Sequence, residues 1–395
     1  MPPSQKCHIL KETPGIKCSN AKNLIQGEVK MKTLLLGDLS PTDSTNPLFE
    51  KHDLQTLFSD TLPLFEGNDI NFVNMECVLT DSEKSIEKFG PPLKATAETA
   101  KVMKKLNFNY CTVCNNHFFD FGIKGVKDSF KILDDLGITY TGFGENYEDS
   151  RKNLTIEKNG EKICFITVCE HEYSYALDDR MGCRPYDEYD TMEDIRNAKK
   201  DSDRVIVIYH GGKEHCRYPS PRLYRLCHAM AKNGADVVLC QHSHCIGCYE
   251  KYNNCHILYG QGNFHFVRPK ELPVPDTWHT SLMVKYDTKN HEIEFIPTIN
   301  YDFKGITLAK GDEKDEIMRE FEKRNKELLT GEWKKGWHAF CESMREHYTN
   351  AIKNACNENS TYKDNTYFGH LLDCEAHTDV WRELFPTANQ TNEKQ

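Results

Sequence analysis

From residue 31 to about residue 300, short apolar runs of strand length alternate with segments of helical period. The strand-like runs cover residues 33–37, 70–75, 110–113, 162–168, 204–209, 236–239, 256–259, 282–286 and 292–296. Between them, residues 97–106, 126–136 and 223–231 repeat apolar side chains at the spacing of one helix face. This alternation predicts an α/β (α+β) fold with a layered αββα architecture.

The pattern changes at both ends of the chain. Residues 1–30 contain several prolines and lysines before the first apolar strand, so we expect a leader outside the fold. Residues 31–304 form the predicted domain. Strand signals end at about residue 305, and charged amphipathic helices are predicted over 312–329 and 333–356. We therefore expect residues 305–395 to be a helical C-terminal extension with a polar tail of about forty residues, and its terminus to be frayed.

Composition excludes some classes of partner. The chain has 50 Lys and Arg against 60 Asp and Glu, a formal charge of −10, which argues against binding to a nucleic-acid backbone. No apolar run approaches the roughly 20 residues that a membrane-spanning helix requires. The first thirty residues lack the apolar core of a signal peptide, and 17 cysteines are typical of a thiol-rich intracellular protein. We expect a cytoplasmic protein without a membrane span.

Polar residues gather where the predicted strands end, which is where open α/β sheets place their ligands. These clusters are Gly37-Asp38, Asn74-Met75-Glu76, Asn115-Asn116-His117, His210-Gly211-Gly212 and Gln241-His242-Ser243-His244. Carboxylate, amide and imidazole donors with few thiols suit Zn, Mn or Fe. His242 and His244 alternate in a segment predicted to be extended, so both side chains are expected to point to one side.

Each cluster taken alone has a structural interpretation. A Gly-Asp pair after a strand commonly forms a turn, and neighbouring asparagines tolerate loop geometry. Two Cys-x-x-Cys pairs, at residues 111 and 114 and at residues 245 and 248, raise the separate hypothesis of a thiolate-bound zinc or iron–sulfur module. Packing of small buried thiols beside strands is the stronger interpretation of these cysteines.

Taken in order, the clusters from Met31 to about Phe266 resemble those of the CapA family of poly-γ-glutamate capsule-biosynthesis proteins, part of the calcineurin-like metallophosphoesterase superfamily. Further matching pieces are Asp120 with Gly122, Glu214 after the His210 cluster, and residues 259–264 with the sequence YGQGNF. The resemblance implies a metallophosphoesterase-like β-sandwich flanked by helices, with one or two divalent metal ions (Mn, Fe or Zn) at the strand ends.

The resemblance also implies roles for single residues. The implied metal ligands are Asp38, Glu76, Asn116, His210, His242 and His244, with Glu76 in the bridging position. His117, oriented by Asp120, is the implied catalytic acid beside the metals, and Asn115, Glu214 and Asn263 are implied to bind substrate. The sequence departs from the superfamily pattern at Ser40, where an Asp-x-His motif would place a histidine, and at Phe118, where an acid would follow the Asn-His pair.

Two functions of different class follow from the resemblance. In the first, the protein is a metal-dependent hydrolase in which a metal-bound hydroxide attacks a phosphoester or amide of an anionic small molecule or polymer, and imidazolium His117 protonates the leaving group. In the second, the same site binds polymer or intermediates without catalysis during polyglutamate synthesis or export.

Three further regions carry alternatives. Residues 170–190, rich in aromatic and basic side chains, are either a substrate-facing insertion or a packed loop. Arg217, Arg222 and Arg225 form either a basic patch or a solvated helix face. The C-terminal helices, with Trp333, Trp337 and His338, either cover the site or mediate homo-oligomer formation.

Overall fold

Two β-sheets form the centre of the computed structural model, which describes residues 31–268, 274–301 and 303–386; the predicted leader 1–30 lies outside these ranges. The eight-stranded sheet has the order β18-β17-β16-β1-β2-β5-β6, with β15 paired to β1, and the six-stranded sheet has the order β13-β14-β12-β11-β9-β8. The strands of the first sheet are β1 (Lys32–Leu39), β2 (Ile70–Met75), β5 (Tyr110–Thr112), β6 (Thr139–Thr141), β15 (Asn263–His265), β16 (Thr280–Asp287), β17 (Glu292–Tyr301) and β18 (Gly305–Leu308). Those of the second are β8 (Leu154–Lys158), β9 (Glu161–Cys169), β11 (Arg204–His210), β12 (Val237–Gln241), β13 (Tyr249–Tyr252) and β14 (Cys255–Leu258).

The alternation of side chains along the strands determines which face each sheet buries. Leu35 and Phe72 of the first sheet share a buried cluster with Phe165 of the second, and the rings of Phe72 and Phe165 stack with centroids 4.3 Å apart. The adjacent residues Leu34 and Val73 point to the opposite face and belong to a different cluster. The two sheets therefore pack face to face as a sandwich.

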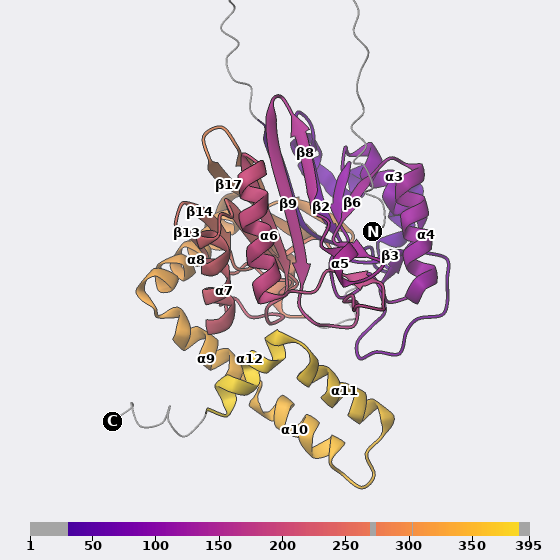
Figure 1. Ribbon diagram of the computed structural model, residues 1–395, viewed down its shortest axis with the longest axis vertical. Coiled ribbons are helices and arrows are strands. Elements are labelled where there is room, and N and C mark those ends of the chain that lie inside the picture. The colour runs from indigo at the N-terminus through magenta and orange to yellow at the C-terminus, as the bar shows by residue number, and fades with distance from the viewer. Residues whose placement is uncertain (1–30, 269–273, 302, 387–395) are drawn as a thin grey trace, which may run out of the picture.

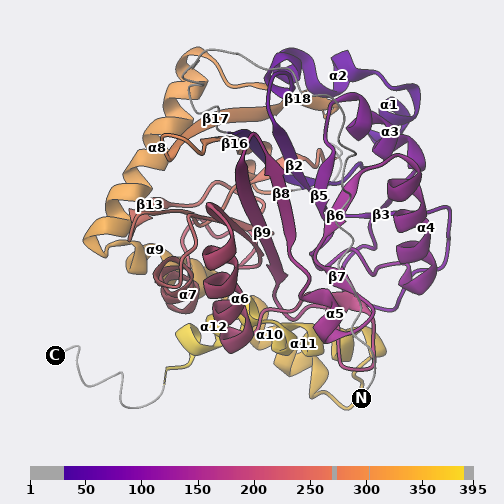
Figure 2. The ribbon, with the colours of Figure 1, turned by 45° about the horizontal axis from the view of Figure 1, so that its top comes forward.

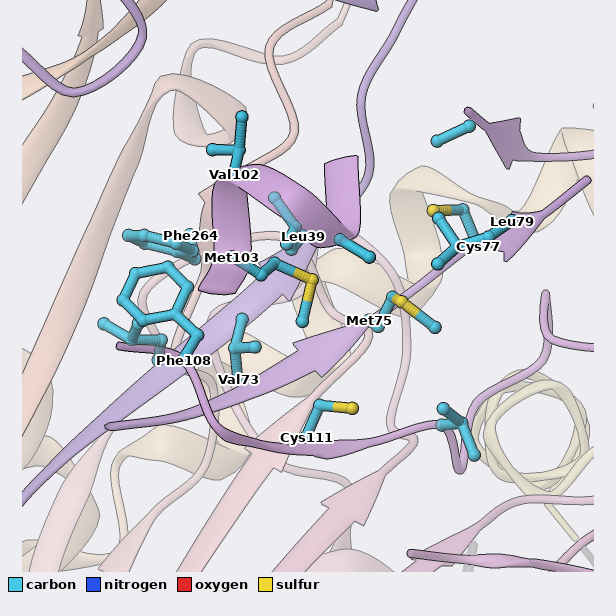
Figure 3. Close-up of a cluster of buried hydrophobic side chains, with 14 of the residues drawn as sticks. Leu39, Val73, Met75, Cys77, Leu79, Val102, Met103, Phe108, Cys111 and Phe264 are labelled. Atoms are coloured by element: carbon cyan, nitrogen blue, oxygen red, sulfur yellow. The ribbon is translucent and has the colours of Figure 1, made fainter. Parts of the chain in front are cut away.

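Helices cover both outer faces of the sandwich (Figure 1). On the first sheet lie α1 (Asn46–Lys51), α2 (Leu54–Phe58), the short helix η1 (Ser59–Phe65), α3 (Ala97–Lys105) and α4 (Gly122–Asp135). On the second lie α6 (Glu188–Asp201) and α7 (Pro221–Lys232). Val102 and Met103 of α3 pack against Val73 and Met75 of β2 in the cluster of Figure 3. The predicted four-layer αββα sandwich is confirmed.

Short elements complete the sandwich. Two small two-stranded sheets pair β3 (Val78–Leu79) with β4 (Lys94–Ala95), and β7 (Phe143–Gly144) with β10 (Gly182–Cys183). The remaining short helices are α5 (Tyr147–Ser150) and η2 (Asp276–His279).

Strand direction brings the polar clusters together. β1, β2 and β5 are parallel to one another in the first sheet, and β9, β11 and β12 are parallel in the second. β15 is parallel to β1 and pairs Asn263 with Asp38. A Cβ atom added at Gly37 would overlap the carbonyl oxygen of Gly262, so glycine is required where these two chain segments cross.

The C-terminal region is longer and more ordered than the sequence predicts. β18 still belongs to the first sheet, so the expectation of no strand after about residue 305 is wrong by one strand. The helices that follow are α8 (Gly311–Thr330), α9 (Trp333–Ser343), α10 (Arg345–Ala355), α11 (Tyr362–Asp373) and α12 (Glu375–Leu384). The boundary of the extension at residue 305 stays a prediction.

The predicted polar tail contains the helices α11 and α12, and the terminus expected to be frayed, residues 387–395, lies outside the described residues. Thr361 forms a capping box with Asp364 at the start of α11, and the capping box satisfies backbone N–H groups at that helix end. Leu371, Val380 and Leu384 are buried in the cluster that covers the second sheet. Among the described residues, no helix is long and apolar enough to cross a membrane.

Candidate metal centre

The residues predicted as metal ligands converge at the carboxyl ends of the parallel strands. Asp38 lies near the end of β1, Glu76 follows β2, Asn116 follows β5, and His210 ends β11, while His242 and His244 follow β12. All six side chains are buried. Both sheets thus contribute candidate ligands to one buried site.

Two groups of side chains are close enough to hold one cation each. Glu76, His210 and His242 form the first group, and Asp38, Glu76 and His244 form the second; within each group the ligand atoms lie within 4.8 Å of one another. Glu76 belongs to both groups. A carboxylate shared by two sets of ligands is the arrangement that a two-metal site needs.

The surroundings of the acids in this centre disfavour their charged form. Burial, followed by repulsion from Glu76, raises the pKa of Asp38 to about 7. Burial, then repulsion from Glu214 and Glu172, raises the pKa of Glu76 well above its ordinary value. Nε2 of His210 lies 3.3 Å from Oε1 of Glu76, but in a geometry that makes no hydrogen bond, so both Glu76 oxygens lack a partner. Nδ1 of His242 is likewise buried without a partner.

A divalent cation fits these donors. It would supply the missing partners of Glu76 and His242 and offset the charge of two buried carboxylates. Burial lowers the pKa of His210 and His242, and lowers that of His244 to about 3, so the three imidazoles are neutral and able to bind metal. Mixed oxygen and nitrogen donors suit Mn, Fe or Zn.

The backbone around the two neighbouring histidines is not extended. His242 and His244 have φ angles of 83° and 54°, in the left-handed region that side chains other than glycine rarely adopt. The expectation that an extended segment would aim both imidazoles is therefore wrong, although both do reach the centre. Residues held in left-handed geometry are common at ligand-binding sites, where the surrounding structure offsets the strain.

Buried amides hold the ligands in place. Nδ2 of Asn74 donates to Oδ1 of Asp38 at 2.7 Å. Nδ2 of Asn115 donates to Oδ1 of Asn74 at 3.0 Å and to the carbonyl oxygen of Met75 at 2.9 Å. Oδ1 of Asn263 lies 2.8 Å from Nδ1 of His244, which fixes the proton on that nitrogen and leaves Nε2 for a metal. The amides of Asn115 and Asn263, predicted to bind substrate, are thus engaged with protein partners.

His117 and Asp120 form the pair expected beside the centre. Nδ1 of His117 lies 2.7 Å from Oδ2 of Asp120, and Nζ of Lys88 donates to Oδ1 of Asp120 at 2.6 Å. Burial and the charge of Lys88 lower the pKa of His117, although Asp120 acts in the opposite direction. The neutral imidazole is therefore favoured over the imidazolium expected from the sequence.

Glu214 is only partly buried. Its side chain is 41% exposed, and its charge acts on His242 and His244. Burial would raise the pKa of Glu214, but Lys213 and the surrounding histidines hold it well below its ordinary value. An ionised, accessible carboxylate at this position is compatible with the predicted contact to substrate.

Sequence reasoning missed Glu172 and Lys88 as residues of the centre. Oε2 of Glu172 lies 3.7 Å from Nε2 of His242, and burial together with Glu214 raises the pKa of Glu172 to about 7. Neither residue belongs to a cluster at a strand end: Lys88 lies in the loop between β3 and β4, and Glu172 follows β9. The only signal for Glu172 was its place in the segment 170–190.

Two of the arginines singled out in the sequence, Arg184 and Arg222, have structural roles. Arg184 is buried and pairs with Asp194 at 2.6 Å, while Tyr189 is 82% exposed. Arg222 forms ion pairs with Glu170 at 2.6 Å and with Asp379 at 2.9 Å. Arg222 is therefore neither a free basic side chain nor part of a solvated face.

The cysteine pairs do not form a metal site in the part of the chain that the structure describes, because both ligand groups there consist of Asp, Glu and His. Cys111 packs in the apolar cluster of Figure 3, and Cys248 in the cluster over the second sheet. The packing interpretation of these thiols is the one that the contacts support.

Comparison with known proteins adds a family to this geometry. Residues 32–268 match the family model described as bacterial capsule synthesis protein PGA_cap. The chain is 27% identical over 246 residues to the capsule biosynthesis protein CapA of Bacillus anthracis, covering 60% of this chain and 60% of that protein. It is 29% identical over 241 residues to the PGA biosynthesis protein CapA of Bacillus subtilis strain 168, covering 58% of this chain and 62% of that protein.

The chain therefore spans about 60% of the length of these relatives. Among solved structures, a hypothetical protein from Thermus thermophilus aligns with 13% identity and a TM-score of 0.38, covering 70% of this chain and 97% of that one. The match to the family model ends at residue 268, before α8–α12 begin.

Proposed function

This chain belongs to the bacterial capsule synthesis protein family that its residues 32–268 match, and we propose that it is a metal-dependent hydrolase acting on an anionic substrate of poly-γ-glutamate metabolism. The observation that carries the proposal is the pair of ligand groups that share Glu76. The names of the Bacillus relatives indicate the class of polymer that we propose as the source of the substrate. The free thiols at the described cysteines support a reducing, cytoplasmic setting.

The residues of the centre divide into ligands and a neighbouring proton carrier. Asp38, Glu76, Asn116, His210, His242 and His244 would hold the ions. When bound, two divalent ions polarise the scissile group and activate a water molecule for attack. His117, held by Asp120, is the group beside the ligands that can carry a proton to or from the reacting atoms. Its neutral state suits a residue that takes up a proton before giving it to a leaving group.

The charges around the centre support an anionic substrate despite the net charge of −10. Arg268 acts electrostatically on Glu76 and Glu214, and Lys88 and Lys213 act on Glu172. These cations, together with bound metal ions, would offset the acids at the place where the substrate binds. A phosphoester and a γ-glutamyl amide both offer the oxygen that such a site would polarise.

The test combines metal analysis with a substrate screen. We expect the purified protein to retain Mn, Fe or Zn and to hydrolyse one class among phosphomonoesters, phosphodiesters and γ-glutamyl amides. His242→Ala should lose bound metal, whereas His117→Ala should keep its metal and lose about 10²–10⁴-fold in kcat. Metal content unchanged in His242→Ala would refute the proposed centre. Full metal loading without turnover on any substrate would favour the alternative of a non-catalytic binding component.

A further inference from the structure

The C-terminal extension contacts the wall of the metal centre. In Figures 1 and 2, helices α10–α12 lie across one end of the sandwich, beyond the end of β9. Two carboxylates make the contact: Oε1 of Glu375 lies 2.6 Å from Nδ1 of His171, and Oε2 of Glu170 accepts from the backbone N–H of Ala376 at 3.0 Å. The segment that carries Glu172 is therefore bound to α12 at the two residues that precede Glu172.

One side chain of the extension reaches further inward. Nδ1 of His370, on α11, lies 3.7 Å from Oε1 of Glu172, whose other oxygen lies 3.7 Å from Nε2 of His242. The side chains of His370 and Glu172 are 9% and 11% exposed, and Nδ1 of His370 is buried without a hydrogen-bond partner. Both distances are longer than a hydrogen bond, so Glu172 lies between the two imidazoles without a hydrogen bond to either.

His370 is held firmly by its surroundings. Its ring stacks on Tyr173 at a centroid distance of 5.5 Å and on Phe89 at 5.3 Å. Nε2 of His370 lies 3.2 Å from Nε2 of His377, whose Nδ1 lies 2.5 Å from the hydroxyl of Tyr348. One arrangement of protons satisfies every atom in this row: Tyr348 donates to His377, His377 donates to His370, and Nδ1 of His370 is left to donate to Glu172.

We propose that Glu172 and His370 are positioning residues, through which the C-terminal extension orients the metal ligand His242. This proposal rests on the proposed metal centre. Histidines that bind metal usually donate their second ring N–H to a carboxylate, which fixes the orientation of the ring. Nδ1 of His242 has no partner, whereas Nε2 faces Glu172. Glu172 thus selects Nδ1 as the metal-binding atom, and His370 holds Glu172 in place.

The experiment measures the affinity of the full-length protein for Mn²⁺ by competition with a chelator. We expect Glu172→Gln and His370→Ala each to weaken binding about 10- to 100-fold, the range typical of residues behind metal ligands. His370→Gln, whose amide can still donate to Glu172, should recover part of the affinity. The matched control is His338→Ala: this histidine of the same extension is 47% exposed and pairs with Glu383, so Mn²⁺ affinity should be unchanged.

A double variant tests the order of action. If His370 acts through Glu172, the Glu172→Gln/His370→Ala protein binds Mn²⁺ no more weakly than Glu172→Gln alone; a loss equal to the product of the two single losses overturns the proposal. Unchanged affinity in a folded His370→Ala protein, monitored by urea unfolding without metal, also overturns it. Should His370→Ala fail to fold, the affinities of Glu172→Gln and His370→Gln decide. A wild-type protein that binds no Mn²⁺, Fe²⁺ or Zn²⁺ would instead refute the proposed function itself.

Discussion

Replacing Asp38 with asparagine should stabilise the metal-free protein while abolishing its metal binding. Asp38 is fully buried, and burial followed by repulsion from Glu76 raises its pKa from 3.8 to about 7. Because the folded pKa exceeds the unfolded one, the protonated acid favours the folded state. This contribution to stability is complete below the unfolded pKa and is lost as the pH rises through about 7.

The magnitude follows from the difference between the two pKa values. At about 1.4 kcal/mol per pH unit, the raised pKa of Asp38 costs the folded state about 4 kcal/mol at about pH 8 and about 2 kcal/mol at about pH 5. The variant keeps an oxygen for the 2.7 Å hydrogen bond from Asn74. It loses the 3.2 Å contact from the backbone N–H of His242 to Oδ2, which costs about 1 kcal/mol at every pH. We therefore expect Asp38→Asn to gain about 3 kcal/mol at about pH 8.

Urea unfolding of metal-free protein at both pH values measures this effect. The advantage of Asp38→Asn over wild type should shrink by about 2 kcal/mol between about pH 8 and about pH 5. Asp60→Asn is a control in which the expected change of stability has the opposite sign. Burial raises the pKa of Asp60, but hydrogen bonds from Leu308 and Thr307, together with Lys310, lower it below its ordinary value. Removing this carboxylate should therefore destabilise the protein at neutral pH. A stability difference for Asp38→Asn that does not change with pH would refute the reasoning.

Three further substitutions test the scaffold around the centre. Phe72→Ala removes the ring that stacks on Phe165 between the sheets and should cost about 3–5 kcal/mol in urea unfolding; a loss below about 1 kcal/mol would contradict the packing described. Gly37→Ala forces a Cβ atom against the backbone of Gly262, so thermal unfolding should show a lower Tm and metal analysis a lower content, since Asp38 is the next residue; wild-type values for both would contradict the close crossing. Arg222→Ala leaves the carboxylate of Glu170 buried without its ion pair and should destabilise by about 3–5 kcal/mol, whereas an unchanged urea midpoint would show that the ion pair is not needed.

The sequence by itself predicted most of the long strands and the polar clusters that follow them. Apolar runs such as residues 204–209 predict strands because β-branched side chains fill a buried sheet, and β11 spans Arg204–His210. Since parallel strands end at one edge of a sheet, His210 and His242 could be expected to meet from their order along the chain alone. The family resemblance added the prediction of which of these side chains are metal ligands.

Only the tertiary structure decided what surrounds those ligands. Lys88, Glu172 and His370 come from two loops and an appended helix, and they meet only because the chain folds their elements onto one end of the sandwich. No periodicity or local spacing encodes such contacts between distant residues. The sequence did not predict the left-handed backbone at His242 and His244 for the same reason. Tertiary packing rather than local preference holds a residue in a strained conformation.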